Sequence, residues 1–600
     1  MTDDLAARAA CLGIEPTWTG FERIDQDCES AGRHSAVNAV ETRPCRFDAL
    51  GGSGANSRPP PTIEAVATAE HPCFVPAKLA DARVWGLTTQ IGALASGRNA
   101  GMGDFADLAN LCVIAAREGA DFVGVNPVHA LFWNDPGRAS PFFPSNRSFL
   151  NPLYLALEWV PGFAGLSQVE AGEAARLREG QLVDHVAVRR LKDGSLRRLY
   201  ASAPAEPGFD AFVADRGDAL RAHAAFEALG GHMTAEGLGA SPSTWPEHYR
   251  TFASPAVAAF MDTHADDVRY HMWLQYQADR QLARVQRTAR EAGMRTGLYL
   301  DLAVGAAPDG SAAWHDPALT VPGLSVGAPP DPFSAAGQDW GLAPLSPVSI
   351  AADEGQAFAA MLGDVVRHAG AVRIDHAMSL ARLWLIPRGR GATEGAYVRY
   401  PLHVLMDRLA EVSHMNETLV IGEDLGNVPP AFRGLMAARS LHAYKVFHFE
   451  RDGADFAEPA TWPRGVLACL GTHDLPTFAG WWHGDDMILR HGIGHLDTDT
   501  LEREQRDRAA DRARLTRRLG PTVDVAELSV RLHAHIAASP CRLAVLQIED
   551  ALGVREQVNL PGTVDKYPNW RRRLPVDVER LADHQGFAAH TAAMRAERPR

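Results

Sequence analysis

Short apolar runs alternate with longer segments of helical periodicity over most of the chain. Runs of 4–8 apolar or β-branched residues are typical of strands buried in a parallel sheet. The predicted strands are 84–90, 121–128, 297–304, 370–375, 418–424, 443–449, 466–474 and 543–550. Eight strands that alternate with helices favour an α/β fold, and at this chain length a (β/α)₈ TIM barrel.

Amphipathic helices are predicted between several of these strands. Segments 104–119, 358–370 and 401–412 each repeat apolar residues at helical spacing. The second and third predicted strands are separated by residues 129–296, which is far more than a βα connection needs. An inserted subdomain is therefore expected at about 129–296, and it contains a predicted helix at 266–291.

Residues 1–80 differ from the rest of the chain. Three of the seven cysteines lie in the first 45 residues, and GGSGANSRPPP follows at 51–61. Such a Gly/Ser/Pro-rich stretch is typical of a linker. We predict a small N-terminal appendage at 1–80, followed by the barrel with its insertions at 81–600.

Composition narrows the class of protein. The formal net charge of −14 argues against a nucleic-acid partner, because phosphate binding needs a basic face. The cysteines are odd in number and have no CxxC spacing, so neither a zinc site nor a disulfide framework is expected. No secretory signal and no apolar run of membrane-spanning length is recognisable. These features predict a cytoplasmic protein without a membrane partner.

Acidic residues stand where three predicted strands end. Asp375 ends the fourth strand in RIDHAMSL, Glu423 ends the fifth in IGEDLG, and Asp474 ends the seventh in GTHDLPT. The carboxyl ends of barrel strands meet at one rim, so these acids are expected to converge. Arg373 lies two residues before Asp375 and therefore faces the same side of its strand. His473 directly precedes Asp474.

This set suits chemistry at an acetal carbon. Retaining enzymes use one carboxylate as nucleophile and one carboxylic acid as proton donor, about 5–5.5 Å apart. A third acid can hold sugar hydroxyls. A single strand-end acid is equally well explained as a helix N-cap. Three acids at three strand ends, with an arginine and a histidine beside two of them, favour catalysis.

The same motifs resemble those of the 4-alpha-glucanotransferases, also called amylomaltases or disproportionating enzymes, of glycoside hydrolase family 77. These enzymes belong to the α-amylase clan of (β/α)₈ barrels. Further segments resemble the family in the same order, and the likeness covers roughly residues 80–600. These segments are QIGALASGRNAGMGDFADLANL (90–111), SPFFPSNRSFLNPLYL (140–155), GLYLDLAVG (297–305), GAPPDPFSAAGQDWGLAPLSP (327–347) and VNLPGTVDKYPNWRRRL (558–574).

The resemblance implies a role for each acid. Asp375 would be the nucleophile, Glu423 the general acid/base and Asp474 the stabiliser of the transition state, with Arg373 and His473 in support. A mobile active-site loop is implied at about 325–347. The substrate-binding residues implied with less specificity are Asp301, Asp331, Trp340, Phe142, Asn559 and Trp570. Trp340 and Trp570 have an alternative interpretation as packing residues.

The implied reaction is transfer of a 1,4-alpha-glucan segment to the 4-hydroxyl of an acceptor, with no cofactor and no metal. The implied partners are maltodextrin, maltose, and glycogen- or starch-derived glucans. Phe142 stands where the family often has tyrosine, which removes one hydroxyl contact and keeps an aromatic face. Two alternatives remain open: an α-amylase-like hydrolase, since water and a sugar hydroxyl attack the same intermediate, and a catalytically silent maltodextrin-binding protein.

Overall fold

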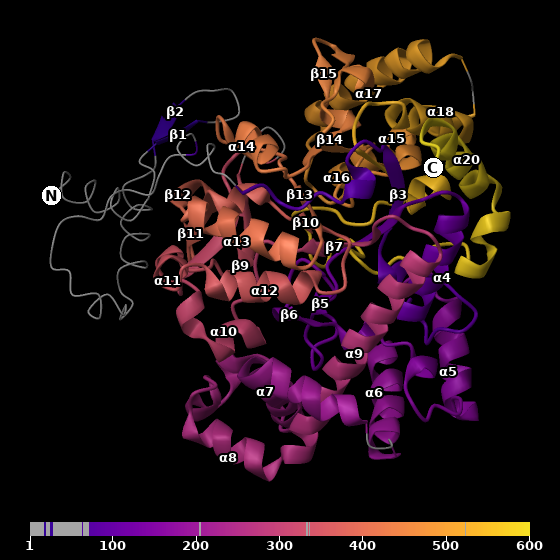
Figure 1. Ribbon diagram of the computed structural model, residues 1–600. Coiled ribbons are helices and arrows are strands. Elements are labelled where there is room, and N and C mark those ends of the chain that lie inside the picture. The colour runs from indigo at the N-terminus through magenta and orange to yellow at the C-terminus, as the bar shows by residue number, and fades with distance from the viewer. Residues whose placement is uncertain are drawn as a thin grey trace, which may run out of the picture.

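The computed structural model describes residues 71–202, 206–331, 334, 336–521 and 524–600, together with residue 63 and two short strands at 17–19 and 25–27 (Figure 1). The predicted N-terminal appendage therefore lies largely outside the described residues. Within the described part, Cys73, Cys112, Cys469 and Cys541 are buried and free. No described helix is both long enough and apolar enough to cross a membrane.

A closed barrel of eight parallel strands forms the centre of the structure. Each predicted strand is present, in the order β13-β10-β7-β4-β3-β18-β17-β14. The ring closes between β13 and β14 through a parallel bridge from Ile421 to His442. This confirms the predicted (β/α)₈ fold. The strands are β3 (Val84–Thr89), β4 (Phe122–Val125), β7 (Gly297–Leu302), β10 (Ala371–Ile374), β13 (Leu419–Gly422), β14 (Ala443–Val446), β17 (Val466–Cys469) and β18 (Leu543–Gln547).

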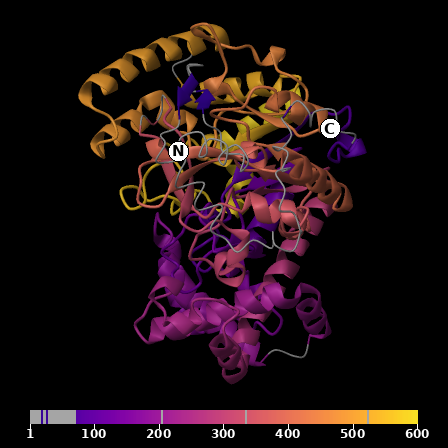
Figure 2. The ribbon, with the colours of Figure 1, turned by 90° about the vertical axis from the view of Figure 1, so that its left-hand side faces the viewer.

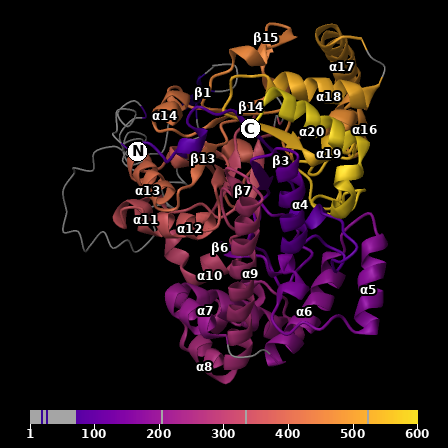
Figure 3. The same ribbon diagram turned by 45° about the vertical axis from the view of Figure 1, so that its right-hand side comes forward.

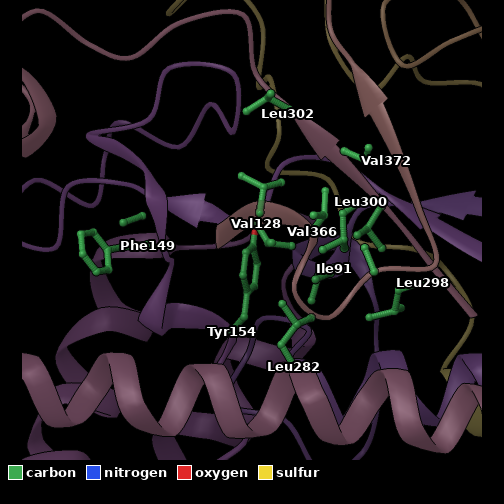
Figure 4. Close-up of a cluster of buried hydrophobic side chains, with 14 of the residues drawn as sticks. Ile91, Val128, Phe149, Tyr154, Leu282, Leu298, Leu300, Leu302, Val366 and Val372 are labelled. Atoms are coloured by element: carbon green, nitrogen blue, oxygen red, sulfur yellow. The ribbon is translucent and has the colours of Figure 1, made fainter. Parts of the chain in front are cut away.

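Alternation along β7 shows how the barrel separates its outer core from its interior. Leucines point outward into the apolar layer between the barrel and helix α9 (Ala265–Glu291), where Figure 4 shows Leu298 and Leu300 on the side of Leu282. They are Leu298, Leu300 and Leu302. Complete burial of each leucine contributes about 2 kcal/mol. The residues between them, Tyr299 and Asp301, share the opposite face because strand side chains alternate. Tyr299 packs inside the barrel with residues of the neighbouring strands.

Helices from the segment between β4 and β7 gather on one side of the barrel (Figures 1 and 3). Helix α9 packs against α4 (Phe105–Arg117) and β7, so it covers the barrel wall as well as belonging to this helical group. The long helix α17 (Thr498–Leu519) lies on the opposite side, at the top of Figure 2. The remaining helices of the group are α5 (Gln168–Glu179), α6 (His185–Ser202), α7 (Pro207–Ala235) and α8 (Pro255–Thr263).

A four-stranded antiparallel sheet stands beside the barrel, with strand order β12-β11-β8-β9. Strands β8 (Leu324–Ala328) and β9 (Gln338–Leu342) lie within the segment expected to be an active-site loop. Much of that segment is thus an antiparallel hairpin. The sequence hides it, because QDWGL has neither strand alternation nor a run of apolar residues. The hairpin packs on β11 (Arg382–Pro387), which also pairs with β12 (Ala396–Arg399).

Candidate active site

The guanidinium group of Arg373 contacts three carboxylates at the rim of the barrel. The Nη1 atom of Arg373 donates to both carboxylate oxygens of Asp301, at 2.9 and 3.0 Å. Its Nη2 atom lies 2.8 Å from Oδ1 of Asp375 and 3.9 Å from Oε2 of Glu423. Asp375 and Glu423 therefore face one nitrogen atom from two neighbouring strands. This close approach suits the retaining arrangement, with carboxyl groups about 5–5.5 Å apart, rather than the wider inverting one.

Burial of this cluster shifts its proton affinities. Burial alone would lower the pKa of Arg373, but the facing carboxylates of Asp301 and Asp375 more than offset this and raise it well above its ordinary value. Arg373 thus stays cationic. Burial raises the pKa of Glu423 to about 7, against the opposing effect of Arg373 and with a further rise from Asp375. Such a value suits a group that must give up and take back a proton near neutral pH.

Backbone amides hold the Glu423 carboxyl group in place. Its Oε2 accepts the amide of His376 at 3.0 Å, and its Oε1 accepts the amide of Leu425 at 2.5 Å. His376 directly follows Asp375 and has a φ of 46°, in the left-handed region that few side chains favour. This conformation belongs to the turn that directs the His376 amide to Glu423. The backbone after Asp375 thereby sets the position of the neighbouring acid.

The third acid lies in a more open environment. The side chain of Asp474 is 47% exposed, whereas that of Glu423 is 10% exposed. Asp474 Oδ1 accepts a hydrogen bond from Asn559 Nδ2 at 2.6 Å, and its Oδ2 lies 3.6 Å from Nε2 of His473. Burial lowers the pKa of His473, and the charge of Asp474 opposes that shift. A neutral imidazole here has one N–H to donate and one nitrogen to accept.

Three aromatic rings pack against one another at the site. Phe142 stacks on His473, with ring centroids 4.6 Å apart and an interplanar angle of 23°. Trp570 lies 5.4 Å from each of these rings. The guanidinium carbon of Arg373 lies 5.9 Å from the Phe142 ring. Phe142 is half-buried, whereas Trp570 is 8% exposed. Trp570 therefore packs beneath the other two rings and exposes little of its own ring to a ligand.

The hairpin of β8 and β9 carries the two remaining substrate-binding candidates. Trp340 on β9 is half-buried and meets the His376 ring edge-to-face, with centroids 5.2 Å apart. It therefore lies next to the turn that follows Asp375 and directs the His376 amide to Glu423. Asp331 lies in the hairpin turn, where its Oδ1 accepts the amide of Ser334 at 2.7 Å. Trp340 thus reaches the acid cluster through the ring of His376.

Comparison with known proteins identifies the family. A family model described as 4-alpha-glucanotransferase matches residues 89–578. The chain belongs to this family. The 4-alpha-glucanotransferase of Mycobacterium tuberculosis (strain H37Rv) is 39% identical over 528 residues, covering 83% of this chain and 72% of the relative. That of Haemophilus influenzae is 33% identical over 541 residues, covering 84% of this chain and 77% of the relative.

A solved structure agrees with the family assignment. The amylomaltase from Corynebacterium glutamicum superposes with a TM-score of 0.84 at 25% identity, covering 99% of this chain and 100% of the other. The family prediction and the barrel prediction are confirmed. This chain is an enzyme of the 4-alpha-glucanotransferase class, which favours transfer over the two alternatives that the motifs alone left open.

Two tyrosines of this 4-alpha-glucanotransferase site escaped the sequence reasoning. Tyr299 and Tyr444 share a hydrogen bond between their hydroxyls at 2.6 Å, and the guanidinium carbon of Arg373 lies 5.8 Å from the Tyr444 ring. Both line a cavity of about 70 Å³ inside the barrel, together with Asp301 and Arg373. Tyr299 lies two residues before Asp301, so strand alternation was the signal that could have found it.

Asn559→Ala is expected to lower the transfer rate about tenfold, because a hydrogen bond to a charged group is worth about 1.5–3 kcal/mol. The change should act on the rate constant kcat more than on KM, since Asn559 orients Asp474 and the acid itself stays in place. Initial rates over a range of maltotriose concentrations measure both constants. Asn416→Ala, on the remote C-terminal end of a helix, is the control. Equal rates in Asn559→Ala and wild type would exclude the positioning role.

Proposed function

We propose that this enzyme transfers a segment of a 1,4-alpha-D-glucan to the 4-hydroxyl of an acceptor glucan or glucose by double displacement. The proposal rests on one observation: the carboxylates of Asp375 and Glu423 both face the Nη2 atom of Arg373. One of these acids is bound tightly by the cation, and the other has its pKa raised by burial. The pair therefore combines a carboxylate held by a cation with an acid that can exchange its proton near neutral pH.

In the first displacement, a carboxylate oxygen of Asp375 attacks the anomeric carbon. Glu423 gives its proton to the glycosidic oxygen as that bond breaks, and the reducing-end portion of the glucan leaves. In the second displacement, Glu423 takes the proton of the acceptor 4-hydroxyl, whose oxygen displaces Asp375 from the anomeric carbon. Two inversions restore the α configuration. Asp474 and His473 would hold sugar hydroxyls as the ring flattens toward the oxocarbenium-like state.

Aromatic and polar groups around the acids support a glucan substrate. Trp340 stands beside the turn at His376, and Phe142 covers His473. Faces and edges of such rings suit the C–H surfaces of sugars. We propose maltodextrin, maltose, and glycogen- or starch-derived glucans as donors and acceptors. The acids alone do not discriminate an acceptor sugar from water, so the preference for transfer rests on the family assignment.

Pure maltotriose separates the candidate functions. A transferase is expected to give glucose together with a series of longer glucans, and the total number of reducing ends should stay constant. An α-amylase-like hydrolase would give only glucose and maltose, and reducing ends would increase with each cleavage. A maltodextrin-binding protein would bind the sugar without changing it. Chromatography of the products with a parallel reducing-end assay distinguishes these results, and either of the last two would overturn the proposal.

A further inference from the structure

A second, larger cavity lies outside the barrel, among the helices α6, α7, α8 and α9. Its volume is about 600 Å³, which is within the range of small-molecule sites. These helices form the lower part of the molecule in Figure 1, on the other side of the barrel from α17. Arginine and histidine side chains make up much of its lining: Arg189, Arg190, Arg197, His232, His264 and His271.

The three arginines share one face of α6. Arg197 is paired with carboxylates, since it lies 3.5 Å from Asp193 and 3.0 Å from Asp267. Arg189 has weaker partners: Asp193 at 3.7 Å and the Oδ1 atom of Asn134 at 3.3 Å. Its Nε atom is buried and has no hydrogen-bond partner within the described residues. Both contacts involve its Nη2 atom and both are long, so the outer end of the guanidinium is held weakly.

Arg190 adds a second available cation at the mouth of the cavity. Its side chain is 76% exposed, and its carboxylate contact is with Glu173 at 3.9 Å. An exposed pair at this distance is worth little, so the guanidinium can turn to a ligand at low cost. Arginine suits phosphate in particular, because its planar fork donates two parallel hydrogen bonds.

His271 supplies a buried donor at the same cavity. It is 5% exposed on α9 and lines the cavity. Burial, together with the charges of Arg197 and Arg189, lowers the pKa of this histidine well below its ordinary value. Glu227, which contacts Asn134 at the cavity, has its pKa raised to about 8 by burial and so adds little negative charge at neutral pH.

We propose that this cavity binds a small organic phosphate, with the phosphate held by Arg189 and Arg190 and the organic body inside the pocket near His271. Three arginines and one carboxylate, that of Asp267, line the cavity, so its wall attracts an anion. The cavity volume exceeds what inorganic phosphate alone would fill. The asparagine that contacts Arg189 belongs to the same connecting segment as Phe142, which lines the active site. Nothing in the proposed glucan transfer uses this cavity, so the two proposals stand or fall separately.

Calorimetric titration of the full chain tests this proposal. The ligands are glucose 1-phosphate, adenosine 5′-monophosphate and inorganic phosphate, with glucose as the uncharged comparison. At least one organic phosphate should bind about tenfold more tightly than inorganic phosphate. Arg190→Gln should weaken that binding about tenfold, because a charge-assisted hydrogen bond is lost. Thermal melting confirms that the variant is folded, which its exposed position favours.

Arg506→Gln on α17 is the matched control. Arg506 is 71% exposed and lies 3.9 Å from Glu502, so it has nearly the same exposure and pairing as Arg190. The control should bind the organic phosphate as wild type does. Tighter binding of the sugar phosphate or of the nucleotide identifies the organic body, and either result supports the site. The proposal is overturned if neither binds, if inorganic phosphate binds as tightly, or if Arg190→Gln has no greater effect than Arg506→Gln.

Discussion

Asp375→Asn is expected to slow glucan transfer by about 10⁴-fold or more, because loss of a covalent nucleophile removes the reaction path itself. An amide cannot form the glycosyl ester, and it carries no charge to balance Arg373 across the 2.8 Å contact. Initial rates of glucose release from maltotriose measure the loss. Binding of maltodextrin should persist, since the sugar-contacting rings and Asp474 are unchanged.

A matched control separates this effect from loss of folding. Asp452 is an exposed aspartate on the hairpin strand β15 (Arg451–Asp452), so Asp452→Asn should retain the wild-type rate. Circular dichroism and thermal melting of both variants should resemble wild type. If Asp375→Asn still produced the series of longer glucans at the wild-type rate, the assignment of the nucleophile would be wrong.

Glu423→Gln is expected to slow transfer from maltotriose about 10³-fold, since general acid–base catalysis contributes roughly 10²–10⁴-fold. The defect should depend on the leaving group. An α-glucosyl fluoride expels fluoride without a proton, so its first displacement should be nearly normal in Glu423→Gln. Rapid-mixing measurement of fluoride release, compared with maltotriose turnover, checks this difference. An equal loss with both donors would contradict the acid role and indicate a general structural defect.

The pH dependence follows from the same group. With a pKa of about 7, Glu423 loses its proton as pH rises through neutrality, and kcat/KM for maltotriose should fall above that point in wild type. This raised pKa also affects stability. Below about pH 4 the group is protonated in both the folded and unfolded states and contributes no difference. As pH rises from about 4.5 to about 7 the folded state loses this stability relative to the unfolded state, and the loss is complete above 7. Glu423→Gln should therefore melt higher than wild type at pH 8 and not at pH 4.

The sequence could predict the barrel because its strands are buried on both faces. Strands such as LVIG at 419–422 and VLAC at 466–469 are continuous apolar runs, which distinguishes them from the helices around them. The convergence of Asp375, Glu423 and Asp474 followed from strand polarity alone. Their pairing with Arg373 was partly predictable, because alternation puts Arg373 and Asp375 on the same face of one strand.

Other features depend on contacts between residues far apart in the chain, which no local sequence pattern contains. The bond from Asn559 to Asp474 joins residues 85 positions apart, and the Tyr299–Tyr444 pair joins strands on separate parts of the wall. The hairpin that carries Trp340 had no strand signal. The cationic cavity also escaped, because Arg189 and His271 lie on different helices and meet only in the folded chain.

Strand pairing on the two sides of Glu423 differs in extent. Strand β10 shares four paired positions with β7 and four with β13, so Asp301 and Arg373 lie on a continuous ladder, and the amide of Asp375 extends it with a bond of 3.0 Å to Leu302 O. Between β13 and β14 the ring closes through the Ile421–His442 bridge, with amide bonds of 2.8 and 3.0 Å, and through the amide of Tyr444, which donates to Oδ1 of Asp424 at 2.8 Å. A small opening at this seam would move Glu423 relative to Asp474 while the nucleophile kept its partners. The barrel thereby fixes the distance from Asp375 to Arg373 more firmly than the distance from Glu423 to Asp474.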